Sequence, residues 1–196
     1  MMRRLEYKWI VATVYVLGLF MNLLDLTITN VALPTLAREF HATTTAVAWV
    51  ATGYLLSVAV CIPVSGWLGD RFGTKRTFLA ALALFTVGSL LCGAAWSIGS
   101  LITFRIVQGI GGGLLTPVGA AMVFRAFPLP ERARVASIVT VPAVLAPALG
   151  PIVGGYLVQY QTWRWIFLVN VPIGILGIVI AALYLQESRV AGTGRG

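Results

Sequence analysis

The 196-residue chain is too apolar and too sparsely charged to be a soluble domain. Hydrophobic residues make up 59% of the sequence and charged residues 10%, whereas soluble domains carry about 25% charged residues. The net charge of +8 does not indicate a nucleic-acid partner, because the cations lie in short turns between apolar runs and form no aromatic-basic surface. The composition predicts an all-α membrane protein with six transmembrane helices.

The apolar runs divide the chain into three predicted parts. Residues 1–8 form a basic N-terminus, residues 9–185 a six-helix transmembrane domain, and residues 186–196 a flexible tail. The first apolar run exceeds a signal-peptide core of about 7–15 residues, so we expect it to remain as a span. The spans are expected at residues 9–33, 46–68, 77–95, 101–124, 135–157 and 165–185.

The first span carries three polar residues on one helical face. Asn22, Asp25 and Thr29 are spaced i, i+3 and i+7, which places them on the same side of a helix. An unpaired carboxylate in hydrocarbon costs roughly 2.5–3.5 kcal/mol on insertion scales, so Asp25 is expected to face protein or a water-filled cavity. We interpret Asp25 as functional, with a structural polar patch as the alternative. Pro34 is expected to end the span.

A short polar stretch separates the second and third spans. Gly69 and Gly73 lie four residues apart and allow a sharp turn and the close approach of a neighbouring helix. The cations of the stretch mark the cytoplasmic side of a membrane protein. An ordinary basic turn would explain the charges but neither the glycines nor the acid. The residues singled out are Gly66, Gly69, Asp70, Arg71, Gly73, Lys75 and Arg76. The third span has no charge and is expected to serve packing and lipid contact.

The fourth span carries the only base expected inside the membrane. Arg105 and Gln108 lie one turn apart on one face, and Gly109 and Gly113 form a G-x-x-x-G pair that favours close helix packing. At about 1.5 Å per residue, Arg105 and Asp25 lie at similar depths below the same membrane surface. Burial of the two as a pair, directly or through water, costs less than burial of either alone. The alternative for Arg105 is a side chain that snorkels to the interface.

The fifth span is rich in proline and small residues. Its prolines are expected to kink the helix, and its small-x-x-x-small stripe is expected to meet another helix closely. This predicted hinge comprises Pro147, Gly150, Pro151, Gly154 and Gly155. Pro128 and Pro130 are expected to end the fourth span, and Trp163, Arg164 and Trp165 to anchor the sixth span at the interface.

Nothing in the sequence predicts a cofactor, a metal ion or an enzymatic reaction. Cys61 and Cys92 lie inside apolar runs, where small packing residues are commoner than a disulfide, and two isolated cysteines cannot form a zinc site. No nucleophile–base set, phosphate loop or metal cluster is present in the sequence. We therefore expect no catalytic residues.

The distribution of cations predicts the orientation. Outside the spans, eleven Lys and Arg residues lie on the side of both termini, and only Arg38 and Arg164 lie on the other side. Cytoplasmic loops carry the excess of positive charge. We expect a multi-pass protein of the cell membrane with both termini in the cytoplasm.

These stretches resemble the motifs of one known family. The pattern G-x-L-x-D-R-x-G-x-K-R at residues 66–76 resembles the signature loop of the major facilitator superfamily. Residues 105–113 and 150–155 are similar to its fourth-helix motif and its antiporter motif, and residues 24–34 and 163–172 look like its 14-spanner drug:proton antiporters (QacA/EmrB type). The resemblance implies the N-terminal six-helix half of that fold and proton-coupled efflux of small amphipathic compounds or drugs.

The resemblance also implies roles for individual residues. Asp25 would carry the proton, and Arg105 would favour its charged form until substrate or conformation separates them. Residues 66–76 would gate the cytoplasmic side, and residues 147–155 would form the antiporter hinge. Asn22, Thr29 and Gln108 are candidates for the substrate pathway. The expected partners are a small-molecule substrate, protons and the lipid bilayer, with no nucleic acid.

Six helices correspond to one half of such a transporter, in which the substrate site lies between two halves. A second transporter half or a homodimer is therefore an expected partner. The alternative is a truncated or half-size membrane module that does not transport alone.

Cysteine labelling tests the predicted orientation. In a background without Cys61 and Cys92, the thiols of Thr74→Cys and Pro130→Cys should resist an impermeant reagent applied outside the cell, because both turns are expected to face the cytoplasm. Labelling after membrane disruption is the control for reactivity. Strong labelling at both positions in intact cells would reverse the orientation.

Overall fold

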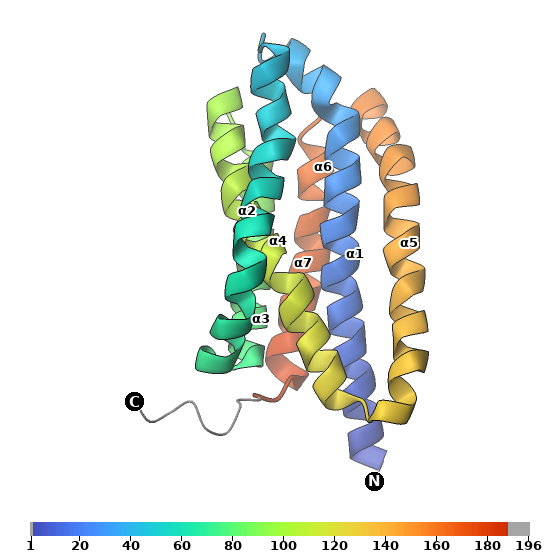
Figure 1. The fold of residues 1–196 in the computed structure, drawn as a ribbon. Coiled ribbons are helices and arrows are strands. Elements are labelled where there is room, and N and C mark those ends of the chain that lie inside the picture. The colour runs from blue at the N-terminus through green and yellow to red at the C-terminus, as the bar shows by residue number, and fades with distance from the viewer. Residues whose placement is uncertain (1, 188–196) are drawn as a thin grey trace.

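Long helices joined by short turns make up the protein. The computed structural model describes residues 2–187, with side chains from residue 7 onward, and this range contains no strand (Figure 1). The helices are α1 (Met2–Glu39), α2 (Thr44–Phe72), α3 (Thr74–Gly93), α4 (Ile98–Ala126), α5 (Leu129–Tyr160), α6 (Trp165–Leu168) and α7 (Asn170–Tyr184). Residues 2–8, predicted as a separate N-terminal segment, are part of α1.

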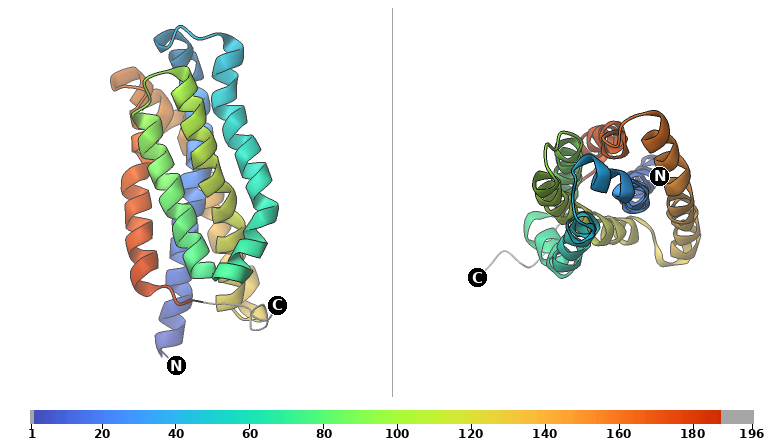
Figure 2. Two further views of the ribbon diagram at one scale, coloured as in Figure 1. Left: turned by 90° about the vertical axis from the view of Figure 1, so that its left-hand side faces the viewer. Right: turned by 90° about the horizontal axis from the view of Figure 1, so that it is seen from above.

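Six helical segments in the described range are long and apolar enough to cross a membrane, with α6 and α7 counted together as one span. The predicted all-α fold with six transmembrane helices is confirmed. Successive spans alternate in direction, so α1 begins and α7 ends at the same end of the bundle (Figures 1 and 2). We call this the basic end, because its turns and helix ends carry Arg71, Lys75, Arg76, Arg125, Arg132 and Arg134.

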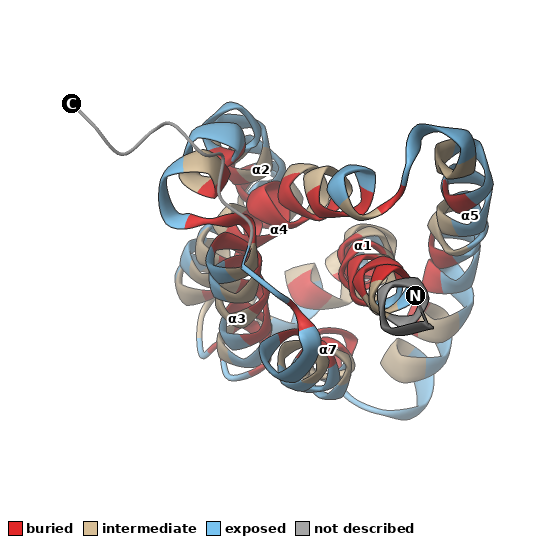
Figure 3. Cartoon of the chain, turned by 90° about the horizontal axis from the view of Figure 1, so that it is seen from below, coloured by how far each residue is buried: buried red, intermediate tan, exposed pale blue. Residues whose placement is uncertain are grey.

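The core lies where α1, α3, α4 and α7 face one another. Seen from the basic end, buried residues line the facing sides of these helices (Figure 3). α4 packs against both α2 and α3, whereas α5 packs mainly against α1. α1 and α4 therefore hold the central positions, and they are the helices that carry the predicted acid and base.

The first span is longer than predicted, because Pro34 does not end it. α1 continues through Pro34 to Glu39. Proline removes one helical hydrogen bond, but the turn beyond it buries Leu36 in a core cluster with Trp163, and this apolar burial favours continuation of the helix. Trp163, predicted to anchor the sixth span at the interface, is 3% exposed and packs edge-on against Phe40.

Prolines also affect the fifth and sixth spans in ways that were not predicted from the sequence. α5 begins at Leu129, so Pro130 lies in its first turn, where a missing N–H costs nothing. The sixth span covers Trp165–Tyr184, close to the predicted 165–185, but its regular helical hydrogen bonding is interrupted at Val169, between α6 and α7, where the backbone keeps helical angles (φ −61°, ψ −28°). Pro172 explains the interruption, because it has no N–H to donate to the carbonyl of Leu168.

Glycines allow α4 to lie close to two helices at once. A Cβ at Gly109 would lie 2.6 Å from the carbonyl oxygen of Tyr54 in α2, and one at Gly113 would also collide with α2. On another side of α4, a Cβ at Gly111 would lie 2.6 Å from the backbone nitrogen of Phe85 in α3. The predicted G-x-x-x-G packing is confirmed, and its partner is α2.

The glycine stripe of α5 faces α1 of the same chain. A Cβ at Gly150 would collide with the Thr27 side chain, and one at Gly154 would lie 2.9 Å from Cγ1 of Ile28. Gly155 faces open space, because a Cβ added there would have no neighbouring atom within 4 Å. The close helix contact predicted from the stripe is therefore made within this chain.

Alanine substitutions at two neighbouring glycines test this contact. Gly150→Ala should lower the free energy of unfolding by about 1–3 kcal/mol relative to Gly155→Ala, because overpacking opposes the gain in helix propensity only at position 150. The measurement is denaturant or thermal unfolding of the purified chain in detergent. Equal stability of the two variants would contradict the α1–α5 contact.

Candidate functional site

Asp25 and Arg105 form an ion pair in the interior of the bundle. Arg105 Nη1 lies 2.5 Å from Asp25 Oδ2, and the side chains of Arg105 and Asp25 are 1% and 0% exposed, respectively. The predicted pair is therefore present as a direct contact, and Arg105 does not reach the surface. Burial of two charges away from water costs on the order of several kcal/mol per ion. The mutual attraction of the two ions offsets this cost only if further hydrogen bonds satisfy their remaining donors and acceptors.

The carboxylate of Asp25 is surrounded by hydrogen-bond donors. Oδ2 accepts from Arg105, while Oδ1 accepts from Gln108 Nε2 at 3.0 Å and from Asn170 Nδ2 at 2.9 Å. Arg105 in turn donates to Gln108 Oε1 at 2.7 Å and, through Nε, to the carbonyl oxygen of Val50 at 3.2 Å. Three donors and no acceptor around the carboxylate match its ionised form.

Ser89 joins this arrangement from α3. Its hydroxyl oxygen accepts from Gln108 Nε2 at 2.8 Å and from Asn170 Nδ2 at 3.2 Å, the same two amides that bind Asp25. Cys92, one turn further along α3, donates its thiol to Gln108 Oε1 at 3.6 Å. We name the group formed by Asp25, Ser89, Arg105, Gln108 and Asn170 the Asp25 network; α1, α3, α4 and α7 all contribute to it.

Tyr54 connects the Asp25 network to Asn22. The guanidinium carbon of Arg105 lies 4.1 Å from the centroid of the Tyr54 ring, within the range of a cation–π interaction. The Tyr54 hydroxyl donates to Asn22 Oδ1, and Asn22 Nδ2 donates to the carbonyl oxygen of Gly112 at 3.2 Å and to Thr116 Oγ1 at 3.3 Å. Polar contacts thus extend from Asp25 to Asn22 across α2 and α4.

The structure separates the three residues predicted for the substrate pathway. Gln108 binds both members of the ion pair, whereas Asn22 is connected to the pair through Tyr54. Thr29 is fully buried, but its hydroxyl donates to the backbone carbonyl of Asp25 at 2.7 Å. This bond satisfies the hydroxyl within its own helix, so the Thr29 side chain is not part of the network.

Sequence reasoning missed Tyr54, Ser89 and Asn170. The third span was expected to serve only packing and lipid contact, yet α3 contributes Ser89 to the network. Serine and tyrosine are common in membrane helices that have no site, so neither residue gave a signal. Asn170 did offer one, because a lone amide in an apolar span needs a buried partner.

At the basic end, the predicted gate residue Asp70 pairs with an unexpected cation. Arg125 Nη2 lies 3.2 Å from Asp70 Oδ1, which ties α2 to α4. Arg71, another residue of the predicted gate, places its guanidinium over the rings of Trp67 and Phe72, at 5.3 and 5.8 Å. Both members of the Asp70–Arg125 pair are at least one-third exposed, so the contact contributes little to stability.

Gly73 forms the tight turn between α2 and α3. Its φ of +94° is unfavourable for other residues, and its N–H donates to the carbonyl of Gly69 at 3.0 Å. A Cβ added at Gly69 would meet Thr74 Cγ2 at 3.8 Å, an ordinary van der Waals distance, so Gly69 does not show the close approach of a neighbouring helix that was predicted for it. The glycine requirement in this stretch is shown most clearly at Gly73.

Glu187 packs against the same turn from the end of the described chain. It accepts from the backbone N–H of Lys75 at 3.1 Å and lies 3.7 Å from Arg76 Nε. The Lys75 ammonium donates to the carbonyl of Ala182 at 2.9 Å. Gln186 and Glu187 thus make specific contacts, whereas the rest of the predicted flexible tail, residues 188–196, lies outside the described residues.

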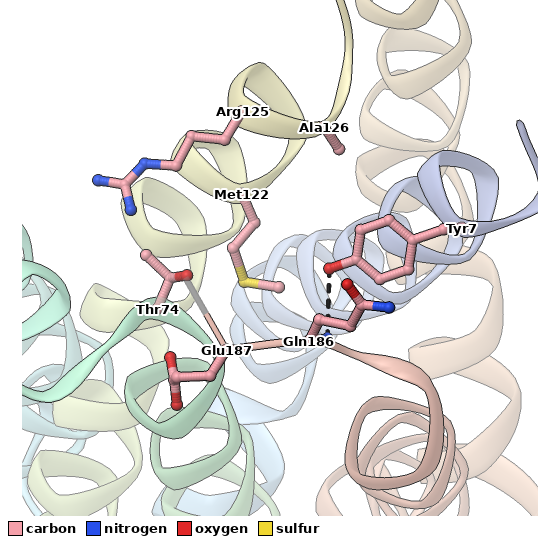
Figure 4. Close-up of a pocket in the computed structure, with 7 residues that line it drawn as sticks. All are labelled: Tyr7, Thr74, Met122, Arg125, Ala126, Gln186 and Glu187. Carbon is pink, nitrogen blue, oxygen red and sulfur yellow. Dashed lines mark hydrogen bonds between the residues drawn. The ribbon is translucent and has the colours of Figure 1, made fainter. Parts of the chain in front are cut away.

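A cavity of about 280 Å³ lies at the basic end. Figure 4 shows Tyr7 and Gln186 turned toward each other at its edge, where the backbone N–H of Gln186 donates to the Tyr7 hydroxyl at 3.2 Å. Arg125 and Glu187 bring one charge of each sign to the lining. Within the described residues, no three His, Cys, Asp or Glu side chains gather as a metal site would require.

The arrangement of spans and motifs matches a known family. Residues 15–195 match the family described as Major Facilitator Superfamily. The chain belongs to the Major Facilitator Superfamily. The resemblance inferred from residues 66–76 and from the motifs in the spans is thereby confirmed.

Relatives of this chain carry names that refer to drug resistance. It is 46% identical over 182 residues to the Multidrug resistance protein B homolog of Mycobacterium tuberculosis (strain CDC 1551 / Oshkosh), covering 93% of this chain and 34% of that protein. It is 43% identical over 182 residues to MdtD of Serratia proteamaculans (strain 568), also named for multidrug resistance, covering 93% and 37%. The chain thus spans little more than a third of these relatives.

A solved structure shows the same fold. The crystal structure of a bacterial homologue of the human lysosomal transporter Spinster, in an inward-facing and occupied conformation, superimposes with a TM-score of 0.81 at 19% identity. The match covers 94% of this chain and 46% of the other chain. The six spans therefore have the arrangement found in about half of a transporter of this fold.

A double-mutant cycle tests the energetic role of the ion pair. Asp25→Asn and Arg105→Gln should each lower the free energy of unfolding by about 3–5 kcal/mol, because each leaves the opposite charge buried without a counter-ion. The double variant should lose less than the sum of the two single losses, because neither charge remains. Unfolding in detergent gives the three values. Additive losses would show that the pair is not coupled.

Proposed function

We propose that the chain forms the N-terminal half of a proton-coupled antiporter that exports small amphipathic compounds. The observation that carries the proposal is the Asp25 network, in which a carboxylate with 0% exposure lies inside a membrane span and is held by donors. Carboxylates within membrane spans are typical of proton pathways. Membership of the family and relatives named for multidrug resistance support the same activity.

Asp25 is the proposed proton carrier. While it is ionised, its attraction to Arg105 holds α1 and α4 together at this point. A proton on the carboxyl removes one of the two charges and most of that attraction, and loss of the proton restores it. The contact between α1 and α4 thus depends on the proton, and antiport requires this kind of coupling between a ligand and a conformational change.

The α5 glycine stripe is the proposed hinge. Gly150 packs on Thr27, two residues from Asp25 in α1, so displacement of α1 at the proton site reaches α5 through a direct contact. Pro147 and Pro151 lie inside α5 on either side of Gly150, where their missing N–H groups weaken the helical hydrogen bonding. Gly154 extends the same contact by one turn, whereas Gly155 lies outside it.

The stretch from Gly66 to Arg76 is the proposed gate. The pair formed by Asp70 and Arg125 joins α2 to α4, and exposed pairs of this kind are worth about 0–1 kcal/mol. Such a contact can break and re-form in each transport cycle at little cost. The concentration of cations at this end favours the cytoplasm as its location, so both ends of the chain are proposed to lie in the cytoplasm and the helices in the cell membrane.

The substrate pathway is proposed to pass between this half and a second half, supplied by another chain segment, another chain or a second copy. Sites of this superfamily lie near the bilayer midplane between the halves. Asn22 and Gln108 are the polar side chains proposed to line the approach from this half. Thr29 is omitted, because its hydroxyl is bound to its own helix.

Export by a chimera tests the proposed function. In it, this chain replaces the matching 182-residue segment of the Mycobacterium tuberculosis relative, and ethidium transport is measured in proteoliposomes under an imposed proton gradient. Asp25→Asn should lower gradient-driven transport at least about tenfold, since the carrier can no longer exchange a proton. Glu39→Gln, which removes an exposed acid at the C-terminal end of α1, is the matched control and should leave the rate unchanged.

Two results would contradict the proposal. Full gradient-driven transport by the Asp25→Asn chimera would leave Asp25 as a structural polar residue. A folded chimera that lacks transport before any substitution, in liposomes where the intact relative is active, would show that this chain does not supply the proposed half.

A further inference from the structure

Asn170 has an unused hydrogen-bond acceptor beside Asp25. Its Nδ2 donates to Asp25 Oδ1 at 2.9 Å and to Ser89 Oγ at 3.2 Å, while its Oδ1 is buried without a hydrogen-bond partner. The whole residue is 0% exposed. A buried acceptor without a partner is unfavourable, so its presence inside an otherwise well-bonded network needs a physical explanation.

The amide of Gln108, the other amide in the Asp25 network, has hydrogen-bond partners at both its oxygen and its nitrogen. Gln108 Oε1 accepts from Arg105 at 2.7 Å and from Cys92 at 3.6 Å, and its Nε2 donates to Asp25 and Ser89. Rotation of this amide by half a turn would break all of these contacts. Rotation of the Asn170 amide would break only its two donor contacts and would bring Oδ1 to the place of Nδ2.

A protonated Asp25 would need a hydrogen-bond acceptor, and Asn170 Oδ1 is an acceptor without a partner. A protonated carboxyl group has an O–H donor, but the groups that face Asp25 in the structure all donate. Arg105 has no acceptor atom, and the oxygen of Gln108 is already bound. Asn170 Oδ1 is the unfilled acceptor among the described members of the network.

We propose that Asn170 is a positioning residue that responds to the protonation of Asp25. Its Nδ2–H donates to the ionised carboxylate; when the carboxyl is protonated, the amide turns about Cβ–Cγ and Oδ1 accepts the new O–H. The proton stays on Asp25 Oδ1, and no covalent bond of Asn170 changes. This inference rests on the proposed role of Asp25 as the proton carrier.

The position of Asn170 in the chain gives this turn a mechanical consequence. Asn170 is the first residue of α7, directly after the interruption at Val169 and two residues before Pro172. The backbone there lacks the helical hydrogen bond that Pro172 cannot donate. Reversal of the hydrogen bond between Asn170 and Asp25 therefore acts next to the point where the sixth span lacks a helical hydrogen bond.

Among the titratable groups near Asn170, Asp25 is the one whose protonation can change the hydrogen bonds of the Asn170 amide. The titratable groups near it are Arg105 on α4, Tyr54 on α2 and Cys92 on α3. The buried residues of α5, α6 and α7 are apolar apart from Asn170. Arg105 stays charged at all relevant pH values, and neither Tyr54 nor Cys92 donates to or accepts from Asn170 in the structure.

NMR of the asparagine side chains tests the proposal in the chain itself. Asn22, Asn30 and Asn170 are the asparagines of the sequence, so ¹³Cγ-labelled asparagine gives few signals, and Asn170→Leu identifies the relevant one. In nanodiscs, the Asn170 carbonyl signal should move downfield with the same midpoint as the labelled Asp25 carboxyl, while exposed Asn30 stays constant. An Asn170 signal that does not change while Asp25 is protonated would overturn the inference.

Asp25→Asn provides the same test without a titration. The neutral amide introduced there has both a donor and an acceptor, as a protonated carboxyl does. The Asn170 carbonyl should then hold its downfield position at every pH. An unchanged Asn30 signal is the control for folding, and the double variant Asp25→Asn/Asn170→Leu assigns the additional signal. An Asn170 signal at the high-pH wild-type position would contradict the proposed turn.

Transport by the chimera separates a response to protonation from simple packing. Asn170→Leu, which neither donates nor accepts, should lower gradient-driven ethidium transport about tenfold with little change in KM. Asn170→Ser, whose hydroxyl does both, should retain most of the rate. Equal losses in the two variants, or normal transport by Asn170→Leu, would overturn the inference. The proposed function would then still be decided by Asp25→Asn.

Discussion

The buried ion pair between Asp25 and Arg105 is the contact on which the arrangement of the bundle depends. Two charges with almost no exposure are stable in an apolar interior only if their remaining hydrogen-bonding groups are also satisfied. This requirement explains why α3, α4 and α7 all bring polar side chains to one point, and why the carbonyl of Val50 in α2 faces the same guanidinium. The polar residues that meet at this point are thus consequences of a single pair.

Close packing by glycine makes this convergence possible. At Gly109 and Gly111 of α4, a single added carbon would collide with the backbone of α2 or α3. A wider separation of these helices would move Val50 away from Arg105 and Ser89 away from Gln108. Small residues therefore do more here than favour helix association: they set the distances at which the hydrogen bonds around Asp25 can form. The glycines of α5 set the distance to α1 in the same way.

The parts of the site that could be predicted from the sequence were the polar groups with only one favourable partner within reach. An acid and a base at the same depth in hydrocarbon have strong reason to pair, and Gln108 shares a helix face with Arg105. Thr29 also shares a face with Asp25, but a hydroxyl can bond to its own helix backbone, and here it does. Asp70 had several cations within reach in sequence, and the packing of α2 beside α4 selected Arg125 over Arg71.

By itself, the sequence determined the six spans, their alternation, the concentration of cations at one end and the family, because hydrophobic length, charge and motif spacing are local properties. Only the tertiary structure decided that Ser89 and Asn170 join Asp25, that the α5 stripe meets α1, that α1 continues past Pro34 and that the sixth span is interrupted at Val169. A helix that is apolar on every side gives no periodic signal for which face is buried. The partners of its few neutral polar groups therefore follow from how the helices meet.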